Sequence, residues 1–145
     1  MENEFLDNTS IINYSKNSYD KTNFSAISEI KLKENPETTK WINTYGIVYQ
    51  EAYRKIIYQN KLDDFLVKLL SDKEHPNKVI LLDNLLFVTT RVLITGSHKF
   101  DSEQMIFIVS LNFLWSIQEK PGDYFNWIRE RLEGNKGIVR KKKAD

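Results

Sequence analysis

Three polar residues close together in the sequence have the types that acid–base chemistry requires. His98, Asp101 and Glu103 combine an imidazole with two carboxylates, and such groups can pass a proton to or from a substrate. Catalysis also needs a pocket and a positioned partner. The neighbouring Gly96 lacks the second glycine and the lysine–hydroxyl pair of a phosphate-binding loop. We therefore interpret the three residues as solvated polar groups of a hairpin, and we predict that the chain has no catalytic residues and is not an enzyme.

The composition argues against a zinc site. The chain has two histidines and no cysteine, whereas zinc sites in proteins are built from several cysteine, histidine or carboxylate ligands. His75 stands beside Pro76 and is interpreted as a surface turn residue. Magnesium asks only for oxygen ligands and keeps several waters, so acidic side chains remain relevant to that ion.

A basic run near the end of the sequence suggests phosphate binding. It consists of Lys136 and residues 140–143, and clustered positive charge can neutralise phosphates or lie near anionic headgroups. The run lacks the interleaved aromatic residues on which single-stranded nucleic acids stack. We favour a different interpretation, the polar first turn of a further helix. Positive charge gains nothing from the dipole at a helix start, which suggests a partner beyond residue 145.

Length and composition indicate one folded domain. The chain has 145 residues, of which 41% are hydrophobic, and a formal net charge of +1. That length is sufficient for a core, and the small net charge creates no overall field that would draw the chain to nucleic acid. Met1 is followed by Glu2 and Glu4 rather than by a secretory leader. The most apolar run, residues 105–117, falls short of the ~20 residues of a membrane helix, so we expect the chain as given to be soluble.

The first half of the sequence predicts strands and helices in alternation. We expect an edge strand at residues 10–14, a loop at 15–22 and a short helix at 24–32. Residues 40–45 alternate as a strand that ends at Gly46. Apolar residues recur at helical spacing over residues 48–60 and 62–70, which predicts two helices with buried faces.

The second half predicts an antiparallel meander. Strands are expected at residues 78–82, 85–94, 104–111 and 113–118, and Asp83 with Asn84 suits the tight turn between the first two. The long apolar runs indicate that both sheet faces are covered. The fold class is therefore α+β, or a layered α/β/α arrangement, with a mixed and largely antiparallel sheet covered by helices.

Residues 118–145 follow the last strand and predict a turn, a helix and a stop. Pro121 and Gly122 mark the turn, and Asp123 has the side chain of a helix N-cap. Phe125, Ile128 and Leu132 give one apolar stripe at helical spacing. Gly134 and Gly137 supply the left-handed dihedrals that end helices.

Tryptophans are expected in or beside the core. Trp41, Trp115 and Trp127 are interpreted as core or core-edge residues. At ~100° of rotation per residue around a helix, Trp127 lies ~100° away from the stripe that contains Phe125. It is therefore also a candidate for covering a second surface, such as a neighbouring helix or subunit. With Trp127, we name Arg140 and Lys141 as candidate contacts to a partner.

The same C-terminal stretch resembles the cytosolic part of the CorA family of magnesium transporters. In that family a strand ending in Gln-Glu leads through Gly-Asp-x-Phe to an Ile-Arg-Glu-Arg helix and an Asn-x-Gly-x-x-Arg-Lys-x-x-Ala-Asp run. The matching residues are Gln118, Glu119, Gly122, Asp123, Phe125, residues 128–131, Asn135, Gly137, Arg140, Lys141, Ala144 and Asp145. Upstream pieces agree in order, namely residues 41–43 with Gly46, residues 78–79 and 86–88, and Glu103 with Gln104. The resemblance covers residues 40–145.

The resemblance implies a fold, a domain division and a function. Residues 1–39 would be a variable strand and helix region, residues 40–137 the core of a CorA-like cytosolic domain, and residues 138–145 the start of a helix truncated before the stalk and membrane helices. The domain would serve subunit packing and ion-dependent gating in a homopentamer at the cytoplasmic face of the inner membrane. The transported and regulatory ion would be Mg²⁺, with Co²⁺ as the alternative, and no ion would be tightly bound here. A zinc transporter of the same superfamily remains open.

The regulatory metal site of the family does not carry over to this sequence. Its acidic pair falls on Lys68 and Leu69 when residues are counted without gaps, and a lysine repels a cation. Asp63, Asp64 and Asp72 are nearby acids that could form a displaced site, although charged helix positions usually face water. The metal ligands therefore remain unassigned.

A second function class stays open beside transport. The chain could be a standalone binding protein with the same fold that engages nucleic acid or anionic surfaces through its basic end. Binding that weakens steeply with salt would distinguish it. Because the basic run lacks stacking aromatics, we do not expect nucleic acid as a partner.

Overall fold

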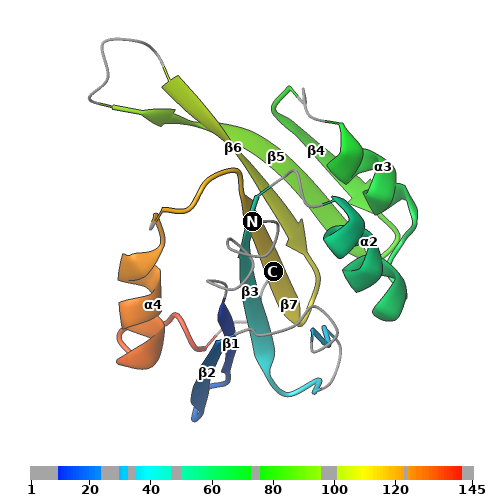
Figure 1. Ribbon diagram of the computed structural model, residues 1–145. Coiled ribbons are helices and arrows are strands. Elements are labelled where there is room, and N and C mark those ends of the chain that lie inside the picture. Colours follow the sequence, from blue (N-terminus) through cyan, green and yellow to red (C-terminus); the bar gives the residue numbers. More distant parts are fainter. Residues whose placement is uncertain are drawn as a thin grey trace.

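A single seven-stranded sheet organises the protein (Figure 1). The computed structural model describes residues 10–23, 30–32, 35–46, 50–72, 76–95, 101–122 and 124–141. The strands are β1 (Ser10–Tyr14), β2 (Tyr19–Asn23), β3 (Thr39–Tyr45), β4 (Lys78–Leu82), β5 (Leu85–Ile94), β6 (Asp101–Val109) and β7 (Phe113–Gln118). The helices are α2 (Gln50–Gln59), α3 (Phe65–Ser71) and α4 (Asn126–Glu133). The strand order across the sheet is β2-β1-β3-β7-β6-β5-β4.

The sheet is mixed and mainly antiparallel, which confirms the predicted fold class. Strands β4 to β7 form the expected meander, with each strand antiparallel to the next. Strand β3 lies parallel to β7, with Ile42 opposite Trp115. Parallel neighbours need a long crossover, and the crossover here contains α2, α3 and the first three strands of the meander.

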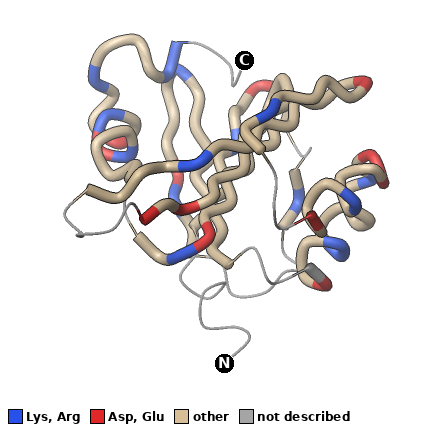
Figure 2. The backbone as a smooth tube through the Cα atoms, turned by 90° about the horizontal axis from the view of Figure 1, so that it is seen from above, with Lys and Arg blue, Asp and Glu red and all other residues tan. Residues whose placement is uncertain are grey.

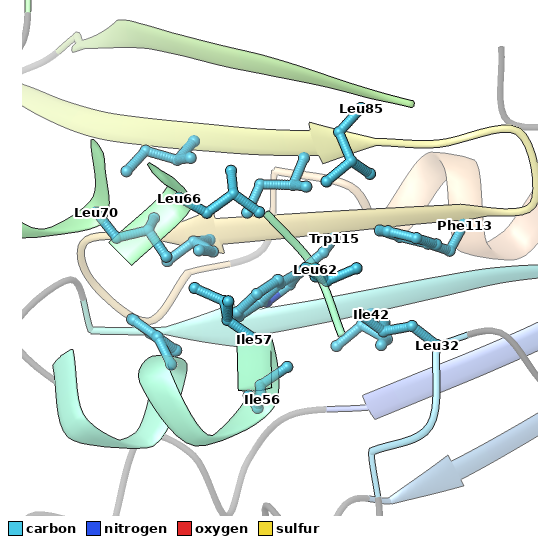
Figure 3. Packing of buried hydrophobic residues seen from close by; sticks show 14 of the residues in the cluster. Leu32, Ile42, Ile56, Ile57, Leu62, Leu66, Leu70, Leu85, Phe113 and Trp115 are labelled. Carbon is cyan, nitrogen blue, oxygen red and sulfur yellow. The ribbon is translucent and has the colours of Figure 1, made fainter. Parts of the chain in front are cut away.

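The face of the sheet toward α2 and α3 carries the larger core. Directly paired residues share a face, so Ile42, Trp115, Ile108 and Phe87 form one continuous apolar row across four strands. All four are buried in a cluster with Ile56 and other residues of the two helices (Figure 3). The opposite face packs against α4. Helices therefore contact both faces, as the long apolar runs indicated.

Helix α2 is tied to the end of β3 by a hydrogen-bonded tyrosine. The Tyr53 hydroxyl donates to the carbonyl of Gly46 at 2.7 Å and lies 3.1 Å from that of Tyr45. Gly46 has φ +89°, a dihedral that glycine reaches without a Cβ clash. The predicted strand stop at Gly46 therefore has a conformational reason.

One predicted loop is wrong. Residues 19–22 of the loop predicted at 15–22, together with Asn23, form the edge strand β2, which pairs antiparallel with β1. The strand is mostly exposed and carries polar residues, so its sequence lacks the apolar alternation that identifies a strand. The predicted short helix at residues 24–32 falls mostly outside the described residues, and its described end, residues 30–32, is not helical.

Among the residues that the structure describes, no helix combines the length and apolarity needed to cross a bilayer.

Candidate functional site

Several buried polar residues contact the linker between β7 and α4, residues 119–125. Glu103 anchors this linker. Its side chain is only 2% exposed. The carboxylate accepts hydrogen bonds from the Lys120 backbone N–H and the Tyr124 hydroxyl, each at 2.8 Å. The prediction that Glu103 is a solvated hairpin residue is therefore wrong. A buried carboxylate needs donors, and these donors lie in a linker that short-range patterns could not place beside β6.

Glu119 and Gln104 secure the same end of the sheet. The Gln104 backbone N–H donates to the Glu119 carboxylate at 2.8 Å, and the Glu119 backbone N–H donates to the Gln104 carbonyl at 3.2 Å. The Gln104 side chain also donates to the Thr89 hydroxyl at 3.0 Å. These contacts extend the β6–β7 ladder beyond its regular part, so the linker leaves the sheet in a defined direction.

A chain of buried polar side chains runs from β3 through β7 to the linker. The Trp41 indole N–H donates to Ser116, and Ser116 donates to Asn43 at 2.6 Å. Asn43 then donates to the side-chain oxygen of Gln118 at 3.0 Å, and Gln118 donates to the Gly122 carbonyl at 3.2 Å. Buried polar groups that are all partnered specify one arrangement. This chain fixes the turn around Gly122 relative to the middle of the sheet.

Helix α4 lies on the sheet face through the predicted apolar stripe. Phe125 meets Trp41 edge-on at 5.7 Å between ring centroids. Ile128 and Leu132 join the same cluster with Ile12 of β1. The helix begins at Asn126, and its N-cap residue is Phe125, without a side-chain capping bond. The predicted cap, Asp123, lies outside the described residues.

An apolar cavity of about 270 Å³ opens between α4 and the sheet. The cavity is lined by Tyr14, Trp41, Phe107, Leu114, Phe125, Ile128, Leu132 and Val139. Burial raises the pKa of Tyr14, and a hydrogen bond with Thr39 opposes that shift. The same sheet face continues from Phe107 through the paired Val88 to Val79 at the edge. Val79 and Leu81 are 64% and 80% exposed, so part of this apolar face is uncovered in the described structure.

The segment after α4 turns back on the domain. Gly134 has φ −76°, so the prediction that it supplies a left-handed residue is wrong. Asn135, at φ +49°, and Gly137, at φ +72°, take that role, since asparagine also tolerates this region. Residues 137–141 form turns, and the Lys141 backbone N–H bonds to the Ile138 carbonyl at 2.9 Å. The predicted start of a further helix is not present within the described part of the chain.

The three candidate partner-contact residues, Trp127, Arg140 and Lys141, differ in solvent exposure. Trp127 is 59% exposed, so its core-edge placement is wrong, whereas Trp41 and Trp115 are buried as predicted. Lys141 is exposed. The Arg140 guanidinium contacts the end of α4 and the ring of Tyr19. A partner contact by these residues stays a prediction.

The acidic candidates lie around α3. Asp63 precedes the N-cap position of α3, and its carboxylate accepts from the Phe65 backbone N–H at 2.8 Å. Asp64 is the N-cap residue and Asp72 the C-cap residue. At 1.5 Å of rise per residue, Asp63 and Asp72 are ~13 Å apart along the axis, so the two ends cannot share one ion. Lys68 is exposed and Leu69 is buried, which leaves no acid at the position of the family's pair.

A second cavity, of about 250 Å³, brings Asp63 near a residue that the sequence did not suggest. Asp83, from the turn between β4 and β5, lines this cavity with Asp63, Asn84 and Lys61. The lysine places a positive charge at the same cavity. Within the described residues no group of three or more His, Cys, Asp or Glu side chains could hold a metal. His75 and His98 lie outside the described residues, and Asp101 is exposed.

Positive and negative residues are interspersed over the helices (Figure 2). Helix α4 itself carries Arg129, Glu130, Arg131 and Glu133. Arg129 lies 5.6 Å above the Trp41 ring, and Arg54 pairs with Glu51 on α2 at 3.4 Å. Because the two signs are mixed, α4 has no extended positive surface. Such a surface is the feature that steers a protein to nucleic acid.

Comparisons with known proteins point to one family. No family model matches the chain. The cobalt/magnesium transport protein CorA of Thermotoga maritima is 29% identical over 142 residues, which is 93% of this chain and 39% of that protein. The resemblance to the CorA family is confirmed. A second relative is the putative ankyrin repeat protein L774 of Acanthamoeba polyphaga mimivirus, 26% identical over 126 residues, 83% of this chain and 18% of that protein.

Solved structures share the CorA-type fold. Full-length CmaX superposes with a TM-score of 0.68 at 18% identity, over 94% of this chain and 41% of CmaX. The ZntB cytoplasmic domain from Vibrio parahaemolyticus gives 0.63 at 15% identity, over 90% of this chain and 52% of that domain. The complete CorA magnesium transporter of Methanocaldococcus jannaschii gives 0.58 at 12% identity, over 89% of this chain and 37% of the transporter. The chain thus spans about two fifths of the CorA proteins that it resembles.

Sequence reasoning found α4 and its stripe but missed the residues that hold the linker. Tyr124 carried no role in the sequence analysis, and Asn43 appeared there only within a family-like piece. Asp83, which lines the second cavity rather than the linker, appeared there only as a turn residue. Tyr124 was the most accessible of these, because it lies inside the family-like Gly-Asp-x-Phe stretch that precedes the helix. Asn43 and Asp83 are joined to their partners only by strand pairing and loop packing, which local spacing does not encode.

Proposed function

We propose that this chain is the cytosolic regulatory domain of a CorA-type divalent metal ion transporter. The observation that carries the proposal is the 29% identity to Thermotoga CorA over 93% of the chain. The fold supports it, because the transporter of Methanocaldococcus jannaschii superposes over 89% of the chain. The transported ion is proposed to be Mg²⁺, with Co²⁺ as the alternative, since the name of the Thermotoga relative includes both.

The domain's proposed task is mechanical. The family-like stretch coincides with the linker, α4 and the segment after it. Partly buried hydrogen bonds with Glu103 and Gln118 hold this unit on the sheet. A segment that is held rigidly on the domain can transmit a movement of the domain to the helices that would follow it. We propose that the domain contributes to subunit packing and ion-dependent gating in this way, as part of a homopentamer with stalk and membrane helices at the cytoplasmic face of the membrane.

The proposed role is that of a non-enzyme without a tightly bound ion. The relatives named as CorA are transport proteins, and the acids around α3 are separated or accompanied by Lys61. Regulation by a divalent ion would therefore use ligands from outside this domain as well. A zinc transporter of the same superfamily stays the alternative that the sequence analysis left open.

Ion flux by the complete polypeptide tests the proposal. The coding sequence is read beyond Asp145, and the encoded protein is placed in vesicles that contain a magnesium-sensitive dye. We expect two apolar stretches of ~20 residues after this domain and Mg²⁺ entry that stops when internal Mg²⁺ is raised. The control is vesicles with a full-length variant whose membrane part cannot transport ions, while the 145 residues of this domain are unchanged. A stop codon directly after Asp145, or no flux of any divalent ion, would reject transport.

A second candidate function has one specific observation in its favour. The mimivirus relative bears the name of an ankyrin repeat protein, and this chain matches 18% of its length. The same domain can therefore occur beside another kind of architecture, as a binding module rather than as a transporter domain. Its proposed target would be an anionic surface met by Lys136, Lys141 and the residues after them.

Salt dependence separates the two functions in the isolated chain. Binding of fluorescent duplex and single-stranded DNA is measured by anisotropy at rising salt. A module that contacts phosphates loses affinity steeply, and Lys136→Ala with Lys141→Ala should weaken it further. The double variant Lys21→Ala with Lys55→Ala is the matched control, since both residues are lysines on other elements. We expect no saturable binding from the transporter domain.

A further inference from the structure

An arginine connects the segment that follows α4 to two other parts of the domain. Arg140 Nε donates to the Leu132 carbonyl at 2.5 Å, and Arg140 Nη2 donates to the Glu133 carbonyl at 2.8 Å. The guanidinium carbon also lies 5.3 Å from the ring centroid of Tyr19 in β2. One side chain therefore joins the end of α4, the edge strand β2 and residues 134–141, which turn back toward that hairpin (Figure 1).

The end of α4 explains why an arginine suits this position. The last four carbonyls of a helix have no partner within it. In α4 the Glu130 carbonyl accepts from the Gly134 N–H and the Arg131 carbonyl from the Lys136 N–H. The fork of Arg140 reaches the next two carbonyls, those of Leu132 and Glu133. The Leu132 carbonyl also accepts from the Asn135 backbone N–H at 3.3 Å. A positive charge is favourable at this negative end of the helix dipole.

The contact with Tyr19 adds the second half of the connection. Tyr19 packs beside the apolar cluster of α4, together with Val139. A guanidinium above an aromatic ring is attracted to the ring's negative face. Strand β2 pairs with β1 at the edge of the sheet, so this contact ties the edge hairpin to the chain end. A lysine could supply the charge but neither the planar stack nor the paired donors.

We propose that Arg140 is a positioning residue that sets the direction in which the chain leaves the domain and couples that direction to the β1–β2 hairpin. With the guanidinium in place, Tyr19, the end of α4 and Lys141 move as one body. Without it, Val139 still holds the segment by apolar packing, but the residues after it are free to reorient. The coupling is a property of the 145 residues and is independent of the transport proposal.

Distance measurements between two spin labels test this directly. The chain has no cysteine, so spin labels attached at Lys21→Cys in β2 and at Lys141→Cys, directly after Arg140, are specific. Both positions are exposed. In the otherwise unchanged chain, we expect pulsed electron–electron double resonance to give a single narrow distribution of distances between the two labels. Circular dichroism of each labelled protein verifies that it is folded.

The variants separate a positioning role from a general contribution to stability. Arg140→Ala should remove the single narrow peak, and Arg140→Lys should restore the charge without restoring the peak. Tyr19→Leu should also broaden it, and adding Tyr19→Leu to Arg140→Ala should broaden it no further, because both act on one contact. Lys136→Ala, which removes a positive charge from the same segment, is the control and should leave the peak unchanged.

Two experimental outcomes would contradict a positioning role for Arg140. A narrow, unshifted peak in folded Arg140→Ala or Arg140→Lys protein would overturn it, because the segment would then be positioned by Val139 and the backbone alone. Equal broadening by Lys136→Ala would overturn it as well. Neither result bears on ion transport, and a loss of transport would leave this coupling intact.

Discussion

A carboxylate that is removed from water must find donors inside the protein, and Glu103 finds them in the linker. Tyr124 and the Lys120 backbone N–H both donate to it at 2.8 Å. Hydrogen bonds to an ionised acceptor are stronger than neutral ones. The linker's path over the sheet end therefore depends on this one side chain.

Replacing Glu103 with glutamine should destabilise the fold. The amide keeps one acceptor oxygen, so one linker donor loses its partner or faces an N–H group. We expect a loss of about 1–3 kcal/mol in the free energy of unfolding, the cost of leaving a buried group unsatisfied, measured by urea denaturation. Asp101→Asn on the same strand is exposed and should change stability by less than ~0.5 kcal/mol. Equal stability of the two variants would contradict the anchoring role.

Tyr124 should titrate late in alkaline solution. Its pKa is raised above the usual 10.0, first by the hydrogen bond to Glu103 and then by burial. A raised folded-state pKa means that the folded state holds the proton more tightly, so this contribution to stability is present below pH 10.0 and is lost as the pH rises toward the folded value. Tyrosinate absorbance and unfolding are followed together against pH.

Two other tyrosines share this alkaline behaviour, so the variant is needed to assign it. Burial also raises the pKa of Tyr14 and of Tyr19. Tyr124→Phe should remove one late-titrating group and flatten the fall in stability above pH 10.0, while Tyr58→Phe, an exposed residue of α2, should not. An unchanged alkaline profile in Tyr124→Phe would argue against the Glu103 contact.

Mg²⁺ should bind the isolated chain only weakly. Asp63 and Asp72 sit at opposite ends of α3, and Lys61 shares the cavity of Asp63 and Asp83. A small, hard cation needs several convergent oxygens. Isothermal titration should show no saturable Mg²⁺ binding below millimolar concentrations, both in the original chain and in Asp63→Asn. Tight binding that Asp63→Asn or Asp83→Asn removes would instead establish a displaced site in this cavity.

At the level of elements, α4 is attached to the sheet by a narrow apolar contact. Leu132 is buried with Ile12 and Trp41, while the outer side of the helix exposes Trp127. The helix has eight residues, too few to be stable in water by itself. Its position therefore depends on the stripe, the linker bonds and the turn that follows.

Leu132→Ala should loosen α4 more than any change on its outer side. Truncating a buried leucine costs about 2–5 kcal/mol, and we expect the lower part of that range because a cavity already adjoins the site. Hydrogen exchange by mass spectrometry should rise over residues 126–133 before the sheet exchanges. Trp127→Ala, which removes a larger but exposed side chain, is the comparison and should stay within ~0.5 kcal/mol of the original. The reverse order of effects would mean that α4 packs through Trp127.

At the scale of the whole molecule, the described residues include two exposed apolar surfaces that are candidates for partner contacts. One is the uncovered part of the sheet face at Val79 and Leu81, and the other is the outer side of α4 around Trp127. Large exposed apolar groups that lie together often mark contacts. The domain division at residues 39 and 137 also stays a prediction, although β1 and β2 share the sheet with the later strands.

The isolated chain should be monomeric or weakly associated. Under the proposed function, the stalk and membrane helices that would hold a pentamer lie outside these 145 residues, so we expect too few contacts for a stable ring. Analytical ultracentrifugation at micromolar concentration should give one species of 17.2 kDa. In an assembled full-length protein the emission of Trp127 should shift to the blue, with Trp127→Phe as the reference. A stable pentamer of the fragment, or a fully solvated Trp127 in the assembly, would contradict this arrangement.

The sequence by itself determined the elements whose physics is local. The meander, the Asp83–Asn84 turn and the stripe of α4 were predicted because apolar spacing and turn residues act over a few positions. The family resemblance and the mixed sheet followed from the same stretches. Strand β2 escaped because an exposed edge strand has no buried face to impose a pattern.

Only the tertiary structure decided which polar residues serve the site. Glu103 and Tyr124 are 21 residues apart, and Asn43 and Gln118 are 75 apart, so their partnership depends on how β3, β6 and β7 pair. The sequence analysis placed Arg140 in the polar first turn of a further helix, whereas the turn at Gly137 brings it back to α4 and Tyr19. A charge pattern records only that a side chain is polar. Whether water or another segment satisfies it is settled by the fold.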